Sequence, residues 1–426
     1  MVATSRFYIL KNLEILRRIP LIFGYKTHTP NSSLSSEDPD NTVHSLLYQT
    51  KKRSSRIQTT MASASSESAQ EVAKRCVQEP WSSTFDPSSI SNSALHELAF
   101  LLFQPSAESI GIPNQQLRTF LSLVQNNYLA NPYHCWAHAV HVTFNAWRLA
   151  RDLVDSSSFD EFDQFILLFS AIIHDLHHPG HTNMVEIESR SPLARLYNDQ
   201  SVIENNSLAK AYELVDSIQL FDGLTKEKQF EVRIRVVEMV LATDISPPTG
   251  KDRATLMAAK WNAAFAGMLE SGAGGVDSGA GGVDSGAGDS GAITFHVETL
   301  EQRQCVLVRL LCIADLGSAM QPFSVFANWS QRLYVENNLC TGLTHEGHVN
   351  TQKPFMEYLC VPLVMEASRF PILKNIEMLK ELLESNLQRW NGLSVEEKCS
   401  AIETEYIQQP ENVDVPEKEG RGSKFE

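Results

Sequence analysis

Histidine and aspartate are concentrated in one part of this 426-residue chain. Seven of its 13 histidines fall between positions 134 and 181, in two short clusters. NPYHCWAHAVHV (131–142) contains His134 and His138, and IIHDLHHPGHTN (172–183) contains His174 and Asp175. Imidazoles and carboxylates bind transition metals, and a histidine also titrates near neutral pH. The clusters therefore indicate metal binding, proton transfer or both.

Two apolar segments with helical spacing each have ionisable residues at one end. FILLFSAII (165–173) leads into His174 and Asp175, and LVRLLCIADL (307–316) carries Asp315. A buried carboxylate needs a cation or a donor, so Asp175 and Asp315 require partners. With His138 and His174 they form a candidate site for zinc or iron.

One of these carboxylates could also reach a second, harder ion such as magnesium or manganese. That is the arrangement of a two-metal hydrolase, in which ions about 3.5–4 Å apart hold a bridging hydroxide. A purely structural zinc site is the alternative, although such sites usually draw on cysteines. The four-residue spacing of His134 and His138 predicts that a helix starting near Pro132 places both on one face.

Apolar residues recur with helical spacing almost throughout residues 80–405, and alternating strand-like runs are nearly absent. We therefore expect an all-α fold. Pro132, Pro179, Pro192 and Pro354 are expected where helices start or stop. The segments expected to be helical are ALHELAFLLF, LRTFLSLV, FDQFILLFSAIIHDL, FEVRIRVVEMVLA, CVLVRLLCIADL, FSVFANWSQRLYV and ILKNIEMLKELLESNLQRW.

Composition divides the chain into one helical domain with polar extensions. We expect a disordered segment over 1–75, a compact multi-helix domain over 76–405 and a flexible tail over 406–426. Within the domain, SGAGGVDSGAGGVDSGAGDSGA (271–292) reads as a glycine-rich surface insertion; a calcium-binding solenoid is the alternative. The basic, apolar first 26 residues are compatible with organellar targeting, with contact to a membrane surface or with a disordered tail.

Charge and cysteine content restrict location and partners. The net charge of −15 argues against nonspecific binding to nucleic acid or to anionic membranes. Seven scattered cysteines without a CxxC pair favour a reducing, cytoplasmic environment. No uncharged apolar run approaches the roughly 18–20 residues of a transmembrane helix. The sequence leaves a homodimer open.

Several ordered motifs resemble those of one enzyme family. HDLHHPGHTN resembles the HD-x-x-H-x-G-x-x-N signature of the class I cyclic-nucleotide phosphodiesterases, within the HD phosphohydrolase superfamily. YHCWAHAVHV is similar to YHN-x-x-HA-x-DV, and SPLARLYNDQSVIEN to S-x-LA-x-x-YND-x-SVLEN. LATD (241–244), ADL (314–316) and TQKPFMEYLCVPL also fit, so the resemblance covers residues 95–390 in order.

The resemblance implies a role for each matching residue. His134 would be the general acid, and Glu336, placed only by its spacing from Asp315, would orient it. Zinc would occupy the first site and magnesium or manganese the second, bridged by Asp175. The first-metal ligands would be His138, His174, Asp175 and Asp315; His178, Asn183, Glu204 and Thr243 would hold waters of the second ion; Gln352, Phe355 and Leu333 would bind the purine.

The implied reaction is hydrolysis of 3′,5′-cyclic nucleotides, cAMP or cGMP or both, to 5′-monophosphates. A hydroxide that bridges the metals would attack phosphorus, and the general acid would protonate the departing 3′ oxygen. Two alternatives remain: a catalytically weak relative that binds cyclic nucleotide as a sensor, and another HD phosphohydrolase acting on nucleotides. The Gln352–Phe355 segment argues against the second.

The sequence also departs from the family pattern near the proposed site. Cys135 stands where the family has Asn, and His141 where it has Asp. Asn206-Ser207 replaces His-His, Cys312 replaces His, and Gly317-Ser318-Ala319 replaces Ser-Asn-Pro. None of these changes removes a proposed metal ligand, the general acid or the glutamine, but they change the packing around them.

Overall fold

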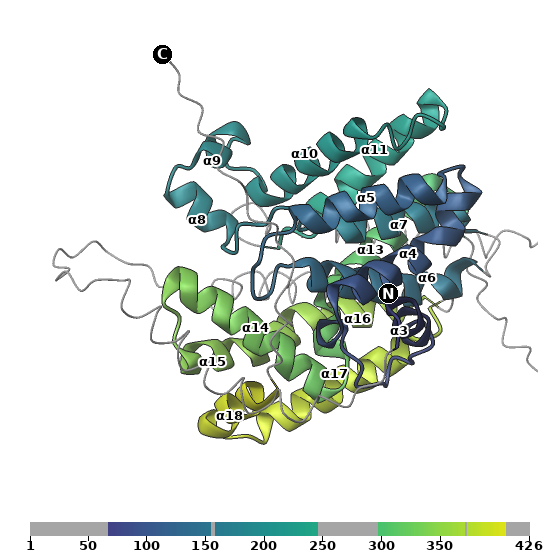
Figure 1. Ribbon diagram of the computed structural model, residues 1–426. Coiled ribbons are helices and arrows are strands. Elements are labelled where there is room, and N and C mark those ends of the chain that lie inside the picture. The colour runs from purple at the N-terminus through teal and green to yellow at the C-terminus, as the bar shows by residue number, and fades with distance from the viewer. Residues whose placement is uncertain (1–66, 155–157, 246–296, 371–372, 406–426) are drawn as a thin grey trace, which may run out of the picture.

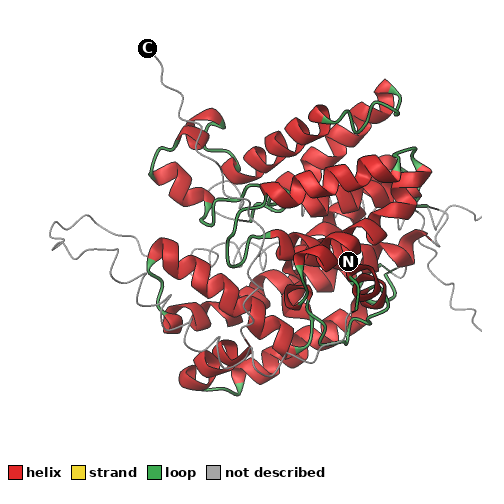
Figure 2. Ribbon diagram, viewed as in Figure 1, coloured by secondary structure: helices red, strands yellow, loops and turns green. Residues whose placement is uncertain are grey.

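The computed structural model describes residues 67–154, 158–245, 297–370 and 373–405 (Figure 1). Within these ranges the chain forms helices, turns and no strand, so the expected all-α class is confirmed (Figure 2). The elements are α3 (Ala69–Cys76), η1 (Pro87–Ser89), α4 (Asn92–Ser109), α5 (Asn114–Asn127), α6 (Trp136–Val154), α7 (Glu161–Ile173), α8 (Asn183–Glu188), α9 (Pro192–Leu196), α10 (Val202–Ser217), α11 (Lys226–Leu241), α13 (Leu300–Asp315), η3 (Leu316–Met320), α14 (Phe323–Thr341), α15 (His345–Phe355), η4 (Met356–Cys360), α16 (Val361–Ala367), α17 (Ile376–Asn391) and α18 (Val395–Glu405).

Three helices at the centre of the molecule, α6, α7 and α13, pack against one another. Every residue of α7 from Phe162 to Ile173 is buried, which explains why its sequence is apolar on all sides rather than on one stripe. In Figure 1, α5, α10 and α11 lie above this centre and α14, α15, α17 and α18 below it. The site residues that follow α7 and end α13 are therefore attached to the most deeply buried helices.

Local sequence signals set where these central helices begin. Asp160 and Asp163 form a reciprocal capping box at the start of α7, and Thr299 and Gln302 do so at α13. Because each cap satisfies backbone donors that the first turn leaves unpaired, the register of the helix is fixed at its start. The other ends of α7 and α13 then present His174 and Asp315 at defined positions.

Two expectations about helix boundaries are corrected. α6 begins at Trp136 rather than near Pro132, so His134 lies in the preceding turn and does not share a helical face with His138. Pro354 lies inside α15, which continues into the π-helix η4, instead of marking a boundary. Pro192 does start a helix, as the first residue of α9.

The predicted domain limits stay predictions. Helix α3 begins at Ala69, a few residues before the expected domain start at 76, and buries Ala73 and Cys76. Most of the N-terminal segment, the glycine-rich insertion at 271–292 and the tail at 406–426 lie outside the described residues.

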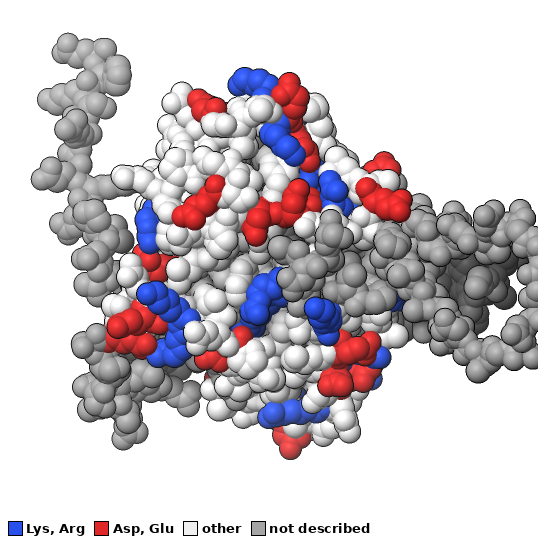
Figure 3. Space-filling model, turned by 90° about the vertical axis from the view of Figure 1, so that its right-hand side faces the viewer, with Lys and Arg blue, Asp and Glu red and all other residues white. Residues whose placement is uncertain are grey.

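No described helix is by itself long and apolar enough to cross a bilayer. Among the described helices, one pair, Leu300–Met320 and Phe323–Thr341, has together the length and apolar composition of a membrane span. The two segments are bent by 103° relative to each other. Both belong to the buried core. On the face of Figure 3, acidic and basic side chains are interspersed among uncharged residues of the described surface.

Candidate metal centre

Four side chains from three helix ends converge in the interior. His138 comes from α6, His174 and Asp175 follow α7, and Asp315 ends α13. The Nε2 atom of His174 lies 3.0 Å from Asp175 Oδ2 and 3.2 Å from Asp315 Oδ1. The Nε2 atom of His138 lies 3.4 Å and 3.2 Å from the same two oxygens. Two imidazole nitrogens and two carboxylate oxygens therefore surround one point.

The donor set fits a divalent metal ion. The Nε2 atoms of His138 and His174 are buried and have no hydrogen-bond partner, although carboxylate oxygens lie close by. The Nδ1 atom of His174 lies 2.8 Å from the Ala171 carbonyl oxygen, to which it donates. This bond places the proton on Nδ1 and leaves the Nε2 lone pair directed at the carboxylates. Unpartnered imidazole nitrogens beside two carboxylates form the environment of a cation site.

The imidazoles and carboxylates of this cluster shift one another's pKa values. Burial opposes ionisation of Asp315, but His174 and His138 hold the pKa of this carboxyl well below its usual range. Burial likewise disfavours protonated His174, but Asp175 and Asp315 raise its pKa well above the usual value. Without a cation, the cluster therefore binds a proton where a metal would otherwise neutralise the carboxylates.

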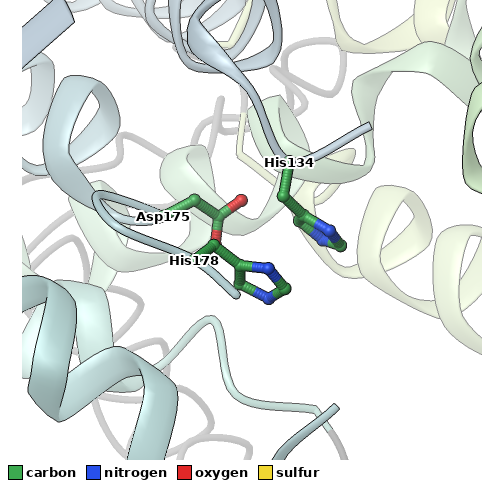
Figure 4. Close-up of side chains that lie close together, drawn as sticks. All are labelled: His134, Asp175 and His178. Carbon is green, nitrogen blue, oxygen red and sulfur yellow. The ribbon is translucent and has the colours of Figure 1, made fainter. Parts of the chain in front are cut away.

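A second group lies beside the first, formed by His134, Asp175 and His178 (Figure 4). The three side chains point toward one another, and their nearest ligand atoms lie within 4.8 Å. Asp175 therefore faces both groups, with Oδ2 toward His138 and His174. A carboxylate in this position can bridge two cations.

His134 is held by a carboxylate from a distant helix. Its Nδ1 atom forms a short contact with Glu336 Oε1 of α14. Glu336 Oε2 also accepts hydrogen bonds from the backbone amides of Tyr133 (2.9 Å) and His134 (3.0 Å). Burial lowers the pKa of His134, but Glu336 and Asp175 outweigh it and raise this pKa to about 9. His134 is thus protonated near neutral pH and held through both side chain and backbone.

Of the residues expected to hold waters of a second ion, Asn183 and Glu204 are hydrogen-bonded to each other. His178 Nδ1 accepts a hydrogen bond from the Gly180 amide at 3.1 Å. Asn183 Nδ2 donates to both carboxylate oxygens of Glu204, at 3.2 and 2.9 Å. Burial raises the pKa of Glu204 to about 8, with added repulsion from Asp244 and Asp175. Thr243 directs its hydroxyl to the Val240 carbonyl of its own turn, 2.8 Å away.

The predicted purine-binding residues lie on α14 and α15. Gln352 is buried, and its Nε2 atom lies 3.2 Å from His348 Nε2. Phe355 is partly buried and packs against the core, and Leu333 is half-buried on α14. Helices α14 and α15 contact each other, but these three side chains are not part of the metal cluster.

Sequence reasoning missed Asn131. Its Nδ2 atom donates to the carbonyl oxygens of His134 (3.1 Å) and His178 (2.7 Å), so one amide joins the two loops that carry them. A Cβ at Gly180, where φ is +82°, would lie 3.0 Å from Asn131 Oδ1. The only sequence signal was its position three residues before His134. Nothing in that spacing indicates a contact with a loop 47 positions away.

The domain is all-helical and joins imidazoles and carboxylates from three helix ends, an arrangement that fits a metal-dependent hydrolase. The profile of the 3′5′-cyclic nucleotide phosphodiesterase family matches residues 133–382. That is more than half of the sequence, and it includes the four candidate metal ligands, His134 and Glu336. The chain belongs to this family.

Individual relatives agree with this assignment. The chain is 39% identical over 141 residues to a dual specificity calcium/calmodulin-dependent 3′,5′-cyclic nucleotide phosphodiesterase 1B of Bos taurus, covering 32% of this chain and 26% of that protein. It is 35% identical over 159 residues to a probable 3′,5′-cyclic phosphodiesterase of Caenorhabditis elegans, covering 36% and 24%. The match thus spans about a quarter of the length of each relative.

A solved structure supports the fold over a larger share of the chain. The phosphodiesterase domain of the Salpingoeca rosetta rhodopsin phosphodiesterase has a TM-score of 0.61 and 26% identity. The similarity covers 80% of this chain and 99% of that domain. The helical region therefore corresponds to a whole phosphodiesterase domain in its arrangement of helices.

Proposed function

We propose that this protein hydrolyses 3′,5′-cyclic nucleotides, cAMP or cGMP or both, to the 5′-monophosphates. The observation that carries the proposal is the pairing of a four-residue donor cluster with an imidazole that a carboxylate holds. A cyclic phosphodiester is an anion that repels hydroxide, so its hydrolysis needs local positive charge and a proton for the leaving oxygen. Membership of the phosphodiesterase family supports the same reaction.

His138, His174, Asp175 and Asp315 would hold a first divalent ion, which we propose is zinc because its ligands include two imidazoles. Asp175 would also bind a second ion, magnesium or manganese, which prefers oxygen ligands and retains water. His178, Asn183, Glu204 and Thr243 would hydrogen-bond those waters. When bound, the two ions would supply charge neutralisation of the phosphate and activation of water.

The protein's own groups would complete the reaction. His134 would donate its proton to the 3′ oxygen as the bond from that oxygen to phosphorus breaks. Glu336 would keep the imidazole oriented and favour its charged form before transfer. Gln352 would hydrogen-bond the base, with Phe355 and Leu333 on its two faces. The glutamine amide offers both a donor and an acceptor, so either purine is compatible with it.

Turnover of cAMP and cGMP by the full chain, measured side by side with metal content, tests this proposal. We expect bound zinc, loss of turnover on chelation and recovery when zinc and magnesium are restored. The product should be the 5′-monophosphate. Metal-loaded protein that binds either nucleotide without turnover would replace the proposal with the sensor function. Hydrolysis of nucleoside triphosphates instead would favour another HD phosphohydrolase activity.

A further inference from the structure

A chain of three buried polar side chains, one imidazole and two amides, links α6 to the residue before Asp315. His141 lies one turn beyond His138, and its Nε2 atom is 2.9 Å from Nε2 and 3.1 Å from Oε1 of Gln321. Gln321 Nε2 donates to Asn145 Oδ1 at 2.9 Å. All three side chains are at most 3% exposed. Three polar groups are thus withdrawn from water and satisfied by one another.

The last link reaches the end of α13. Asn145 Nδ2 donates to the carbonyl oxygen of Ala314 at 3.3 Å. This carbonyl lies in the final turn of the helix, and it also accepts from the backbone amide of Leu316. Because Asp315 is the next residue, the bond from Asn145 restrains the backbone that positions its carboxylate.

Gly317 leaves room for this contact. A Cβ at position 317 would lie 2.6 Å from Asn145 Nδ2 and 3.4 Å from its Cγ. The first separation is below any real Cβ contact, and Asn145 is fully buried, so the amide could stay in place only by displacing the backbone at 317. His141 and Gly317 are two of the departures from the family pattern, and this network connects them.

We propose that His141, Gln321 and Asn145 are positioning residues that orient Asp315 for metal binding, and that the glycine at 317 is required for their arrangement. The inference rests on the proposed metal centre. It gives His141 and Gly317, two positions that differ from the family pattern, a shared structural role. The affinity of the His138–His174–Asp315 group for zinc should then depend on a network that touches none of the ligand atoms.

The test compares Asn145→Ala, Gly317→Ala and the double variant with the unchanged chain. The apparent zinc dissociation constant is measured by competition with a chelator, and the melting temperature of metal-free protein reports folding. We expect each single variant to weaken zinc binding about 10–100-fold, the usual effect of losing support behind a ligand. The double variant should bind zinc no more weakly than Asn145→Ala, since the clash at 317 disappears with the amide.

Asn127→Ala is the matched control, because Asn127 also donates from Nδ2 to a helix carbonyl, that of Leu123, but in α5. Its zinc affinity should equal that of the unchanged chain. If Asn145→Ala does not fold, Gln321→Met is the second variant. It keeps a similar volume and removes the bonds from Gln321 to His141 and Asn145, which hold the Asn145 amide against the Ala314 carbonyl, so it should also lower zinc affinity.

Unchanged zinc affinity in Asn145→Ala, or in Gln321→Met where the first variant is unfolded, would overturn the inference. If the double variant lost zinc affinity by the combined factors of the two single variants, the proposed role of Gly317 would be overturned. An unchanged chain that binds no zinc would instead refute the proposed metal centre. The two failures are therefore distinguishable.

Discussion

The imidazole rings of His134 and His178 lie face to face, with centroids 3.8 Å apart and planes 22° apart. Their pKa values are nevertheless shifted in opposite directions. Burial, together with the nearby charge of His134, lowers the pKa of His178 to about 3. Carboxylates overcome burial at His134 and raise its pKa to about 9. Neighbouring groups whose pKa values are driven apart are typical of sites that transfer protons.

Replacing His134 with Ala should separate proton donation from metal binding. The ring makes none of the contacts among His138, His174, Asp175 and Asp315, so the first ion should be retained. The rate should fall about 10²–10⁴-fold, the usual contribution of a general acid. Metal analysis and turnover of both nucleotides are the measurements. Loss of zinc together with activity would show that His134 has been given the wrong role.

Glu336→Gln should change the pH dependence of kcat/KM. A group whose pKa is raised is protonated below that pKa and loses its proton as pH rises through it. Glu336 is the main carboxylate raising the pKa of His134, so the neutral amide should lower that pKa. The alkaline limb of the profile should therefore move to lower pH.

Glu227→Gln, a change at the exposed start of α11, is the control. Its kcat/KM should depend on pH as in the unchanged chain. An alkaline limb at the same pH in Glu336→Gln would mean that another group sets it.

Asp315→Ala should release the first metal and abolish turnover. It removes an oxygen that lies 3.2 Å from both ligand imidazoles and leaves Asp175 as the sole carboxylate there. Zinc content after gel filtration is the measurement, with Asp222→Ala at an exposed position as the control. Full zinc retention in the Asp315 variant would place the ion elsewhere.

Asn131→Asp should lower kcat with little change in bound metal. The carboxylate is almost isosteric with the amide but cannot donate to the carbonyls of His134 and His178, and it would repel both. We expect a loss of roughly tenfold to a hundredfold, as for a 1–3 kcal/mol loss of buried hydrogen bonding. Wild-type kcat in this variant would show that the link between the two loops does not position the acid.

Much of this architecture is readable from the sequence because it depends on local signals. Apolar runs mark α7 and α13, and the ionisable residues His174 and Asp315 stand at their ends. The position of His134 before α6, by contrast, depends on Glu336, 202 positions away. The role of Asn131 and the contact of Asn145 with Gly317 likewise depend on packing between distant segments, which spacing along the chain does not encode.

Anomalous diffraction at the zinc edge, from crystals of zinc-loaded full-length protein, is the most direct test of the metal centre. We expect a peak about 2.0–2.2 Å from Nε2 of His138, Nε2 of His174 and one oxygen each of Asp175 and Asp315. Stoichiometric zinc bound elsewhere, with no peak among these four side chains, would contradict the proposed metal centre.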